Sequence, residues 1–138
     1  MTIVRILILA TAVLLGGCAG LQPVAPPAQP SDNTAVLALM NKAQSQAAAG
    51  QMDEARANLE RALRIEPRNP VLWHELARIR LKQGQYRQAE NLAAKSNVLA
   101  GANGYLRAKN WRIIGEARSR RGDLQGARAA FEKAEETP

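Results

Sequence analysis

Residues 69–89, NPVLWHELARIRLKQGQYRQA, decide the fold of this chain. Asn69 is a good helix N-cap, and the φ angle of Pro70 is already set for a first helical position. Apolar residues then recur at helical spacing until Gly84, which permits a tight turn into a second helix. Ala89 is small enough to let two antiparallel helices approach closely. The segment therefore predicts a helix-turn-helix hairpin.

The same pattern occurs three times along the chain. Gly50 and Gly84 lie 34 residues apart, and Gly122 marks a third copy that follows a four-residue insertion at 104–107. A fixed period of this length is typical of stacked helical repeats. The three units span 36–69, 70–103 and 108–138. We expect six helices, at 34–48, 53–65, 70–83, 87–98, 104–120 and 124–136.

The residue types within each unit resemble the tetratricopeptide repeat (TPR). Trp73, Leu76 and Ala77 in the second unit, and Trp111, Ile114 and Gly115 in the third, match its first helix. The resemblance implies an all-α fold in which three helix-turn-helix units stack as a short right-handed superhelix, the TPR domain being residues 34–138. Both tryptophans are expected to pack inside their own units.

The N-terminus reads as an export signal. Arg5 precedes an apolar run from Ile6 to Leu15, which is too short to cross a bilayer. Leu15-Gly16-Gly17-Cys18 resembles the bacterial lipobox, which implies that residues 1–17 are a lipoprotein signal peptide. It also implies that Cys18 carries a diacylglycerol and an N-acyl chain. The alternative is an ordinary signal peptide with a free cysteine.

A proline-rich segment separates this signal from the repeats. Residues 18–33 hold Pro23, Pro26, Pro27 and Pro30 without apolar periodicity, so we expect a lipidated cysteine followed by a disordered linker. Fifteen extended residues reach about 46 Å, which keeps the domain close to its membrane. By resemblance to lipoprotein sorting, Ala19 after the cysteine implies the periplasmic face of the outer membrane.

The family resemblance also places a partner site. TPR domains bind partners in the groove lined by their first helices, and the matching stripe here is apolar in unit one and basic in units two and three. A ligand with a hydrophobic anchor and acidic flanks suits such a groove. We expect His74 to be a groove or surface residue. The predicted groove residues are Met40, Gln44, His74, Arg78, Lys82, Lys109, Arg112 and Arg120.

Composition argues against several classes of function. The formal net charge is +7, with twelve Lys or Arg against three acidic residues between Arg78 and Arg128, which favours anionic partners. The sequence contains one histidine and one cysteine and shows no nucleophile–base pair, metal-ligand spacing or phosphate loop. We therefore expect no enzyme activity, no cofactor beyond the covalent lipid, no metal and no nucleic-acid partner.

What remains is a membrane-anchored adaptor. The layout of lipobox, proline-rich tether and short TPR array is similar to the LpoP-type outer-membrane lipoproteins, which activate class A penicillin-binding proteins. That resemblance implies a role in peptidoglycan synthesis. The alternative is an assembly factor similar to TPR pilotins, serving a secretion or type IV pilus component. We expect a monomer, although the alanine-rich last helix leaves pairing with another copy open.

Overall fold

The computed structural model describes residues 30–137, and the predictions for residues 1–17, Cys18 and the linker up to residue 29 lie outside them. The described part contains six helices, which differ from the predicted ranges by no more than one residue at either end. They are α2 (Thr34–Ala48), α3 (Met52–Ile65), α4 (Pro70–Lys82), α5 (Tyr86–Leu99), α6 (Gly104–Arg120) and α7 (Leu124–Glu136). None of these six helices is long and apolar enough to cross a membrane.

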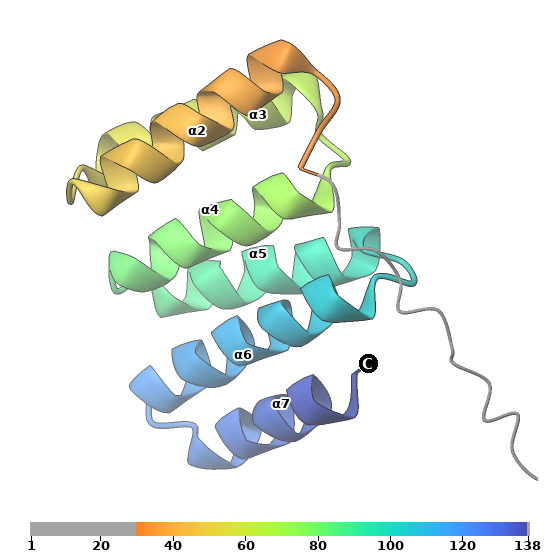
Figure 1. Cartoon of the computed structure of the whole chain (residues 1–138). Coiled ribbons are helices and arrows are strands. Elements are labelled where there is room, and N and C mark those ends of the chain that lie inside the picture. Colours follow the sequence, from red (N-terminus) through yellow and green to blue (C-terminus); the bar gives the residue numbers. More distant parts are fainter. Residues whose placement is uncertain (1–29, 138) are drawn as a thin grey trace, which may run out of the picture.

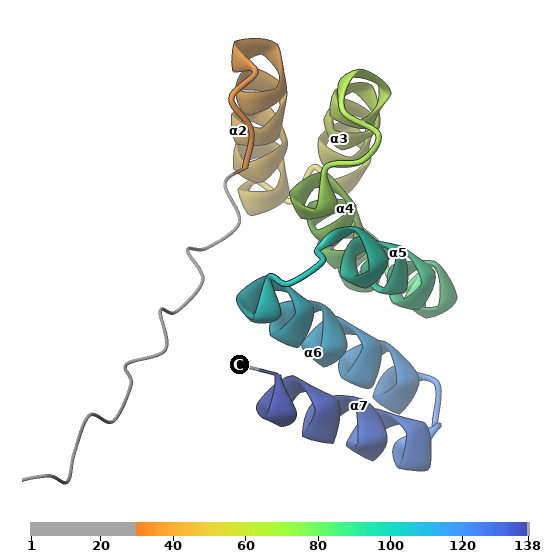
Figure 2. The same ribbon diagram turned by 90° about the vertical axis from the view of Figure 1, so that its right-hand side faces the viewer.

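The helices form three antiparallel pairs that follow one another in a single stack. Helices α2 and α3 form the first pair, α4 and α5 the second, and α6 and α7 the third (Figure 1). The view turned by 90° shows the same order, with α7 at one end of the stack (Figure 2). The predicted all-α, three-unit architecture is therefore confirmed.

Local chemistry fixes the ends of the first helices. The side-chain oxygens of Asn33, Asn69 and Asn103 each accept hydrogen bonds from backbone amides in the first turn of α2, α4 and α6. These bonds satisfy amides that have no partner inside the helix. After the same helices, the turn glycines adopt φ between 73° and 82°, a region that residues with a Cβ rarely occupy. The turn glycines are Gly50, Gly84 and Gly122.

Two apolar clusters hold the stack together. The first joins α2, α3 and α4 around Val36, Leu59 and Leu72, which are at most 2% exposed. The second joins α4, α5, α6 and α7 and is built largely from alanines and two isoleucines. Trp73 packs partly buried against the first cluster and Trp111 against the second. Each indole ring is also covered by a lysine of its own unit.

A chain of buried polar groups crosses the second unit and the start of the third. The Ser96 hydroxyl donates to the Pro70 carbonyl at 2.8 Å, and Asn110 Nδ2 donates to Ser96 Oγ at 2.8 Å. His74 Nδ1 lies 2.7 Å from Asn110 Oδ1. Because that amide oxygen can only accept, the imidazole donates through Nδ1. The chain ties α4, α5 and α6 together.

The segment just before α2 lies against the loop between α3 and α4. The Ser31 hydroxyl donates to the Glu66 carboxylate at 2.6 Å, and the Asn69 amide donates to the Pro30 carbonyl. Among the described residues, Pro30 and Ser31 thus connect the segment before α2 to the helical domain. They hold the end of the tether beside the boundary between units one and two.

Replacing Asn110 with alanine should destabilise the domain by about 2 kcal/mol, because it leaves the buried Ser96 hydroxyl and His74 ring without their shared partner. Urea denaturation measures the loss. The matched control is Asn41→Ala on the exposed face of α2, where the change should stay within about 0.5 kcal/mol. Equal effects of the two substitutions would contradict a stabilising role for the buried chain.

Burial of the His74 ring makes stability depend on pH. Burial lowers the pKa of His74 below 6.5, with Arg78 and Lys109 lowering it further, against raising contributions from the Asn110 hydrogen bond and Glu75. Above the unfolded pKa both states are neutral. As the pH falls through that value, the unfolded chain binds a proton more readily, so the free energy of unfolding decreases until the folded pKa is also passed.

Between about pH 7.5 and pH 5.5, the wild type should therefore lose more stability than His74→Gln, which does not titrate there. Thermal or urea unfolding at several pH values gives the comparison. Parallel curves for the two proteins would show that His74 is not the titrating group.

Candidate partner-binding groove

A groove of about 800 Å³ runs between α4 and α6. The two helices contribute all but one of its lining residues, and Tyr86 comes from the start of α5. The groove is lined by Val71, His74, Glu75, Arg78, Leu81, Lys82, Tyr86, Tyr105, Leu106, Lys109, Arg112, Ile113, Glu116 and Arg120.

The groove has a strong excess of positive charge, with five cationic side chains against two carboxylates. Arg78 pairs with Glu75 at 2.9 Å, and Arg120 approaches Glu116 at 3.6 Å. Lys82 and Arg112 have no carboxylate within salt-bridge distance among residues 30–137. An anionic ligand would therefore pair with Lys82 and Arg112 without first breaking a salt bridge inside the protein.

Aromatic and apolar groups lie among these charges. The Lys109 ammonium sits 4.5 Å from the centre of the Tyr105 ring, which is 53% exposed. Leu81, Leu106 and Ile113 supply apolar surface deeper in the groove. The combination fits a peptide that presents both an apolar side chain and acidic residues.

A smaller hollow of about 290 Å³ continues the groove toward α2. It shares Glu75, Arg78 and Lys82 with the main groove, and alanines of α2 form much of its remaining wall. The concave side thus changes from small apolar residues at the N-terminal end to cations at the C-terminal end. This is the gradient that the first-helix stripe predicts.

Most of the predicted groove residues come together, but Met40 does not. Gln44 lines the smaller hollow. The Met40 side chain is 4% exposed and belongs to the core between α2, α3 and α4, so it offers no groove surface. The predicted residues that line the main groove are His74, Arg78, Lys82, Lys109, Arg112 and Arg120.

His74 lines the groove but is not a surface residue. It is 6% exposed, and its Nδ1 atom is already engaged by Asn110. The structure therefore places His74 in the groove, one of its two expected locations, with little of the ring accessible. Its partner Asn110 lies 36 residues away on α6. The local sequence around His74 does not predict a contact between residues so far apart in the chain.

Sequence reasoning missed Tyr105 and Tyr86 as groove residues. Tyr105 lies in the four-residue insertion, which extends α6 by about one turn at its N-terminus. At helical spacing Tyr105 shares a face with Lys109 and Arg112, so extending the third-unit stripe back by four residues would have found it. Tyr86 comes from a second helix, which the first-helix rule does not consider.

No group of three or more histidine, cysteine or acidic side chains arranged to hold a metal is found among residues 30–137. What the groove offers is shape, charge and exposed aromatic surface. These are features of a binding site for a polypeptide.

Comparison with known proteins supports this interpretation of the fold. A tetratricopeptide-repeat family model matches residues 46–97. The N-terminal domain of stress-induced protein-1 from C. elegans superposes with a TM-score of 0.69 at 15% identity, covering 76% of this chain and 87% of that one. The second TPR of Spaghetti, solved with an HSP90 peptide, gives 0.67 at 21% identity, covering 76% and 94%. These likenesses establish the fold as a short right-handed TPR superhelix.

No relative is found among curated protein sequences. One solved structure, however, is similar in sequence as well as in fold. It is the globular C-terminal domain of P. aeruginosa LpoP, with a TM-score of 0.74 and 40% identity, covering 76% of this chain and 99% of that domain. The chain described here therefore belongs to the family of LpoP-like tetratricopeptide-repeat proteins.

Proposed function

We propose that this protein is a lipid-anchored adaptor of the outer membrane that binds and activates a class A penicillin-binding protein, and that it has no catalytic activity of its own. The observation that carries the proposal is the 40% identity over 99% of the LpoP domain. At that identity the family is shared, and activation of the synthase is the role that the LpoP resemblance implies.

The groove between α4 and α6 is the surface we assign to the synthase. It combines five cations with exposed tyrosine and buried leucine and isoleucine side chains. The TPR domain of Spaghetti was solved with the peptide SRMEEVD, which is rich in acidic residues. An acidic, partly apolar segment of the synthase would complement the present groove in the same sense.

The proposed anchor defines where this encounter takes place. Acyl chains on Cys18 would hold the N-terminus at the outer membrane, since two or three chains anchor stably. The tether would place the domain within about 46 Å of that surface. The synthase, which is anchored in the inner membrane, would have to extend across the periplasm to reach the groove.

Residues 30–138, purified as a soluble domain, should stimulate glycan-strand synthesis by the cognate synthase in vitro. The double charge reversal Arg78→Glu with Arg112→Glu should weaken binding by at least about tenfold and flatten its dependence on salt, since both side chains line the groove. Titration of polymerisation rate and of binding at several salt concentrations measures both effects.

The control for this pair is Arg61→Glu with Arg64→Glu, two exposed positions of α3 outside the groove that change the net charge equally. Equal losses in both double variants would mean that net charge, not the groove, governs binding. Absence of stimulation, together with loss of secretin or pilus assembly when the gene is deleted, would favour the assembly-factor alternative.

Replacing Cys18 with serine should release the full-length protein from the membrane fraction and abolish metabolic labelling by palmitate, because the thiol is the proposed attachment point. Cell fractionation and labelling give the readout. Retention of the label in Cys18→Ser would contradict lipidation at this residue.

A further inference from the structure

The face of each second helix that receives the next unit can be followed through the whole stack. On α3 this receiving face consists of Met52, Arg56, Leu59 and Leu63. Helix α4 packs over it, leaving Leu59 2% and Leu63 8% exposed. The glycine alignment gives the same positions on the other second helices. They are Tyr86, Glu90, Ala93 and Asn97 on α5, and Leu124, Arg128, Phe131 and Glu135 on α7.

The last receiving face is uncovered. Ala93 on α5 is 0% exposed under the third unit, whereas on α7 Phe131 is 40% and Leu124 69% exposed. Helix α7 closes the described stack, and no further helix lies on its outer side (Figures 1 and 2). The inner edge of the Phe131 ring is held against Gly115, where a Cβ atom would come within 2.6 Å of it. The ring is thus supported on one side and open on the other.

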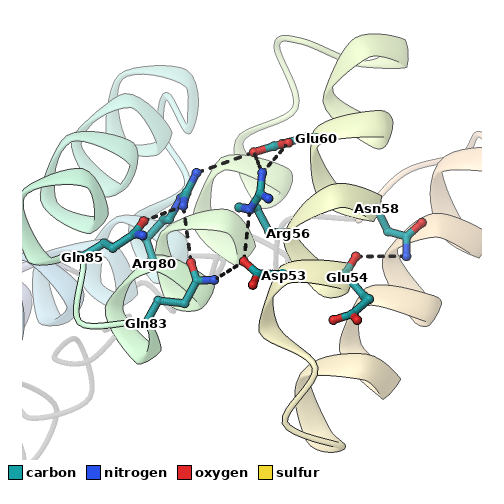
Figure 3. Close-up of polar contacts among 8 residues, drawn as sticks. All are labelled: Asp53, Glu54, Arg56, Asn58, Glu60, Arg80, Gln83 and Gln85. Atoms are coloured by element: carbon teal, nitrogen blue, oxygen red, sulfur yellow. Dashed lines mark hydrogen bonds and ion pairs between the residues drawn. The ribbon is translucent and has the colours of Figure 1, made fainter.

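Ion pairs at the boundary between units one and two, here called the first seam, show how the next unit packs on such a face. Arg56 and Glu60 pair along α3 at 2.9 Å, and Arg80 of the next unit reaches the same Glu60 carboxylate at 3.6 Å (Figure 3). The Arg80 guanidinium also donates to Gln83 and Gln85, which hold it at the seam. A cation from the first helix of the next unit therefore forms an ion pair at the polar edge of the apolar contact between the units.

Helix α7 has the same residue types as α3 at the two ion-pairing positions and has a charged residue at one position that is apolar in α3. Arg128 and Glu132 occupy the positions of Arg56 and Glu60, while Glu135 replaces the buried Leu63. At 100° per residue, Leu124, Arg128, Phe131 and Glu135 fall within a stripe of about 60° on one side of the helix. All four are exposed. After Leu124, the stripe therefore presents a basic, an aromatic and an acidic side chain in turn.

We propose that the receiving face of α7 binds a second copy of this chain, with the two α7 helices antiparallel about a twofold axis between positions 131 and 132. In this register Arg128 of each copy faces Glu135 of the other, so two ion pairs form. The two Phe131 rings are offset along the axis by about one residue, or 1.5 Å, which suits offset stacking. An isologous contact of this kind closes on itself.

Self-complementary charge is the reason to assign a second copy and not an unrelated helix. Arg128 and Glu135 lie almost symmetrically about the exposed Phe131 ring. In an antiparallel pair of identical helices, each of them therefore faces the opposite charge of the other copy. A single helix pair buries less area than a stable dimer needs, so the contact is weak in dilute solution. Anchoring both copies to one membrane by the proposed lipid would raise their effective concentration and populate the pair.

The test uses residues 30–138, since the related LpoP structure is of the globular domain alone and shows that this part folds by itself. Sedimentation of the wild type up to about 1 mM, the range of weak contacts, should show a monomer–dimer equilibrium. Arg128→Glu and Glu135→Arg should each weaken it by at least about tenfold, because both place like charges opposite each other. Thermal unfolding checks that each variant is folded.

Mixing the two single variants provides the decisive comparison. In the mixed pair, both glutamates of one copy face both arginines of the other, so association should return although neither variant associates alone. A wild type that stays monomeric throughout the range would overturn the proposal. So would single variants that associate like the wild type, or a mixture that does not recover. Any of these results would leave the face to a helix of another protein or to solvent.

A cysteine scan in the same domain, which lacks Cys18, gives an independent readout. Glu132→Cys lies beside the proposed axis and should form a disulfide-linked dimer under mild oxidation. Ala129→Cys, exposed on another side of α7, is the matched control and should not. Equal cross-linking at the two positions would contradict the proposed face.

Discussion

The hydrogen-bonded chain from the Pro70 carbonyl through Ser96 and Asn110 to His74 is the constraint on which the stack depends. Its members come from α4, α5 and α6 and are buried, and the apolar cluster that joins these helices consists of four alanines and two isoleucines. A buried polar group costs stability unless its partner is present at the right geometry. The hydrogen-bonded chain therefore determines the geometry with which the third unit packs on the second. The alanines allow the helices to approach closely but do not select one geometry.

The three units share a pattern but close their seams by different means. At the first seam Leu59 and Leu72 supply apolar volume, and Arg80 completes the polar border with Glu60. At the second seam, between units two and three, the contact is made by the buried polar chain and by the Glu90 carboxylate, which accepts from Arg118 at 2.7 Å. The two boundaries between units are therefore chemically different, although the units share one sequence pattern.

The sequence predicts the elements well and the contacts between them poorly. Asn69, Pro70 and the turn glycines act through neighbouring atoms, so helix bounds followed within one residue. The cationic stripe also followed, because helical periodicity is local. Met40 was misplaced and the burial of His74 was not predicted, since the environment of both side chains is set by packing between helices of different units. The partner of His74 is 36 positions away, and Met40 belongs to the core that α2 shares with α3 and α4.

Repetition itself explains why two distinct binding surfaces arise from one motif. First helices present an inward stripe along the whole array, which becomes a groove when units stack. Second helices present a receiving face that each next unit covers, so only the last remains exposed. The groove cations Lys82, Lys109 and Arg112 lie on α4 and α6, whereas Phe131 lies on α7. Occupation of one surface leaves the other open, so a tethered pair would still present two grooves to its partner.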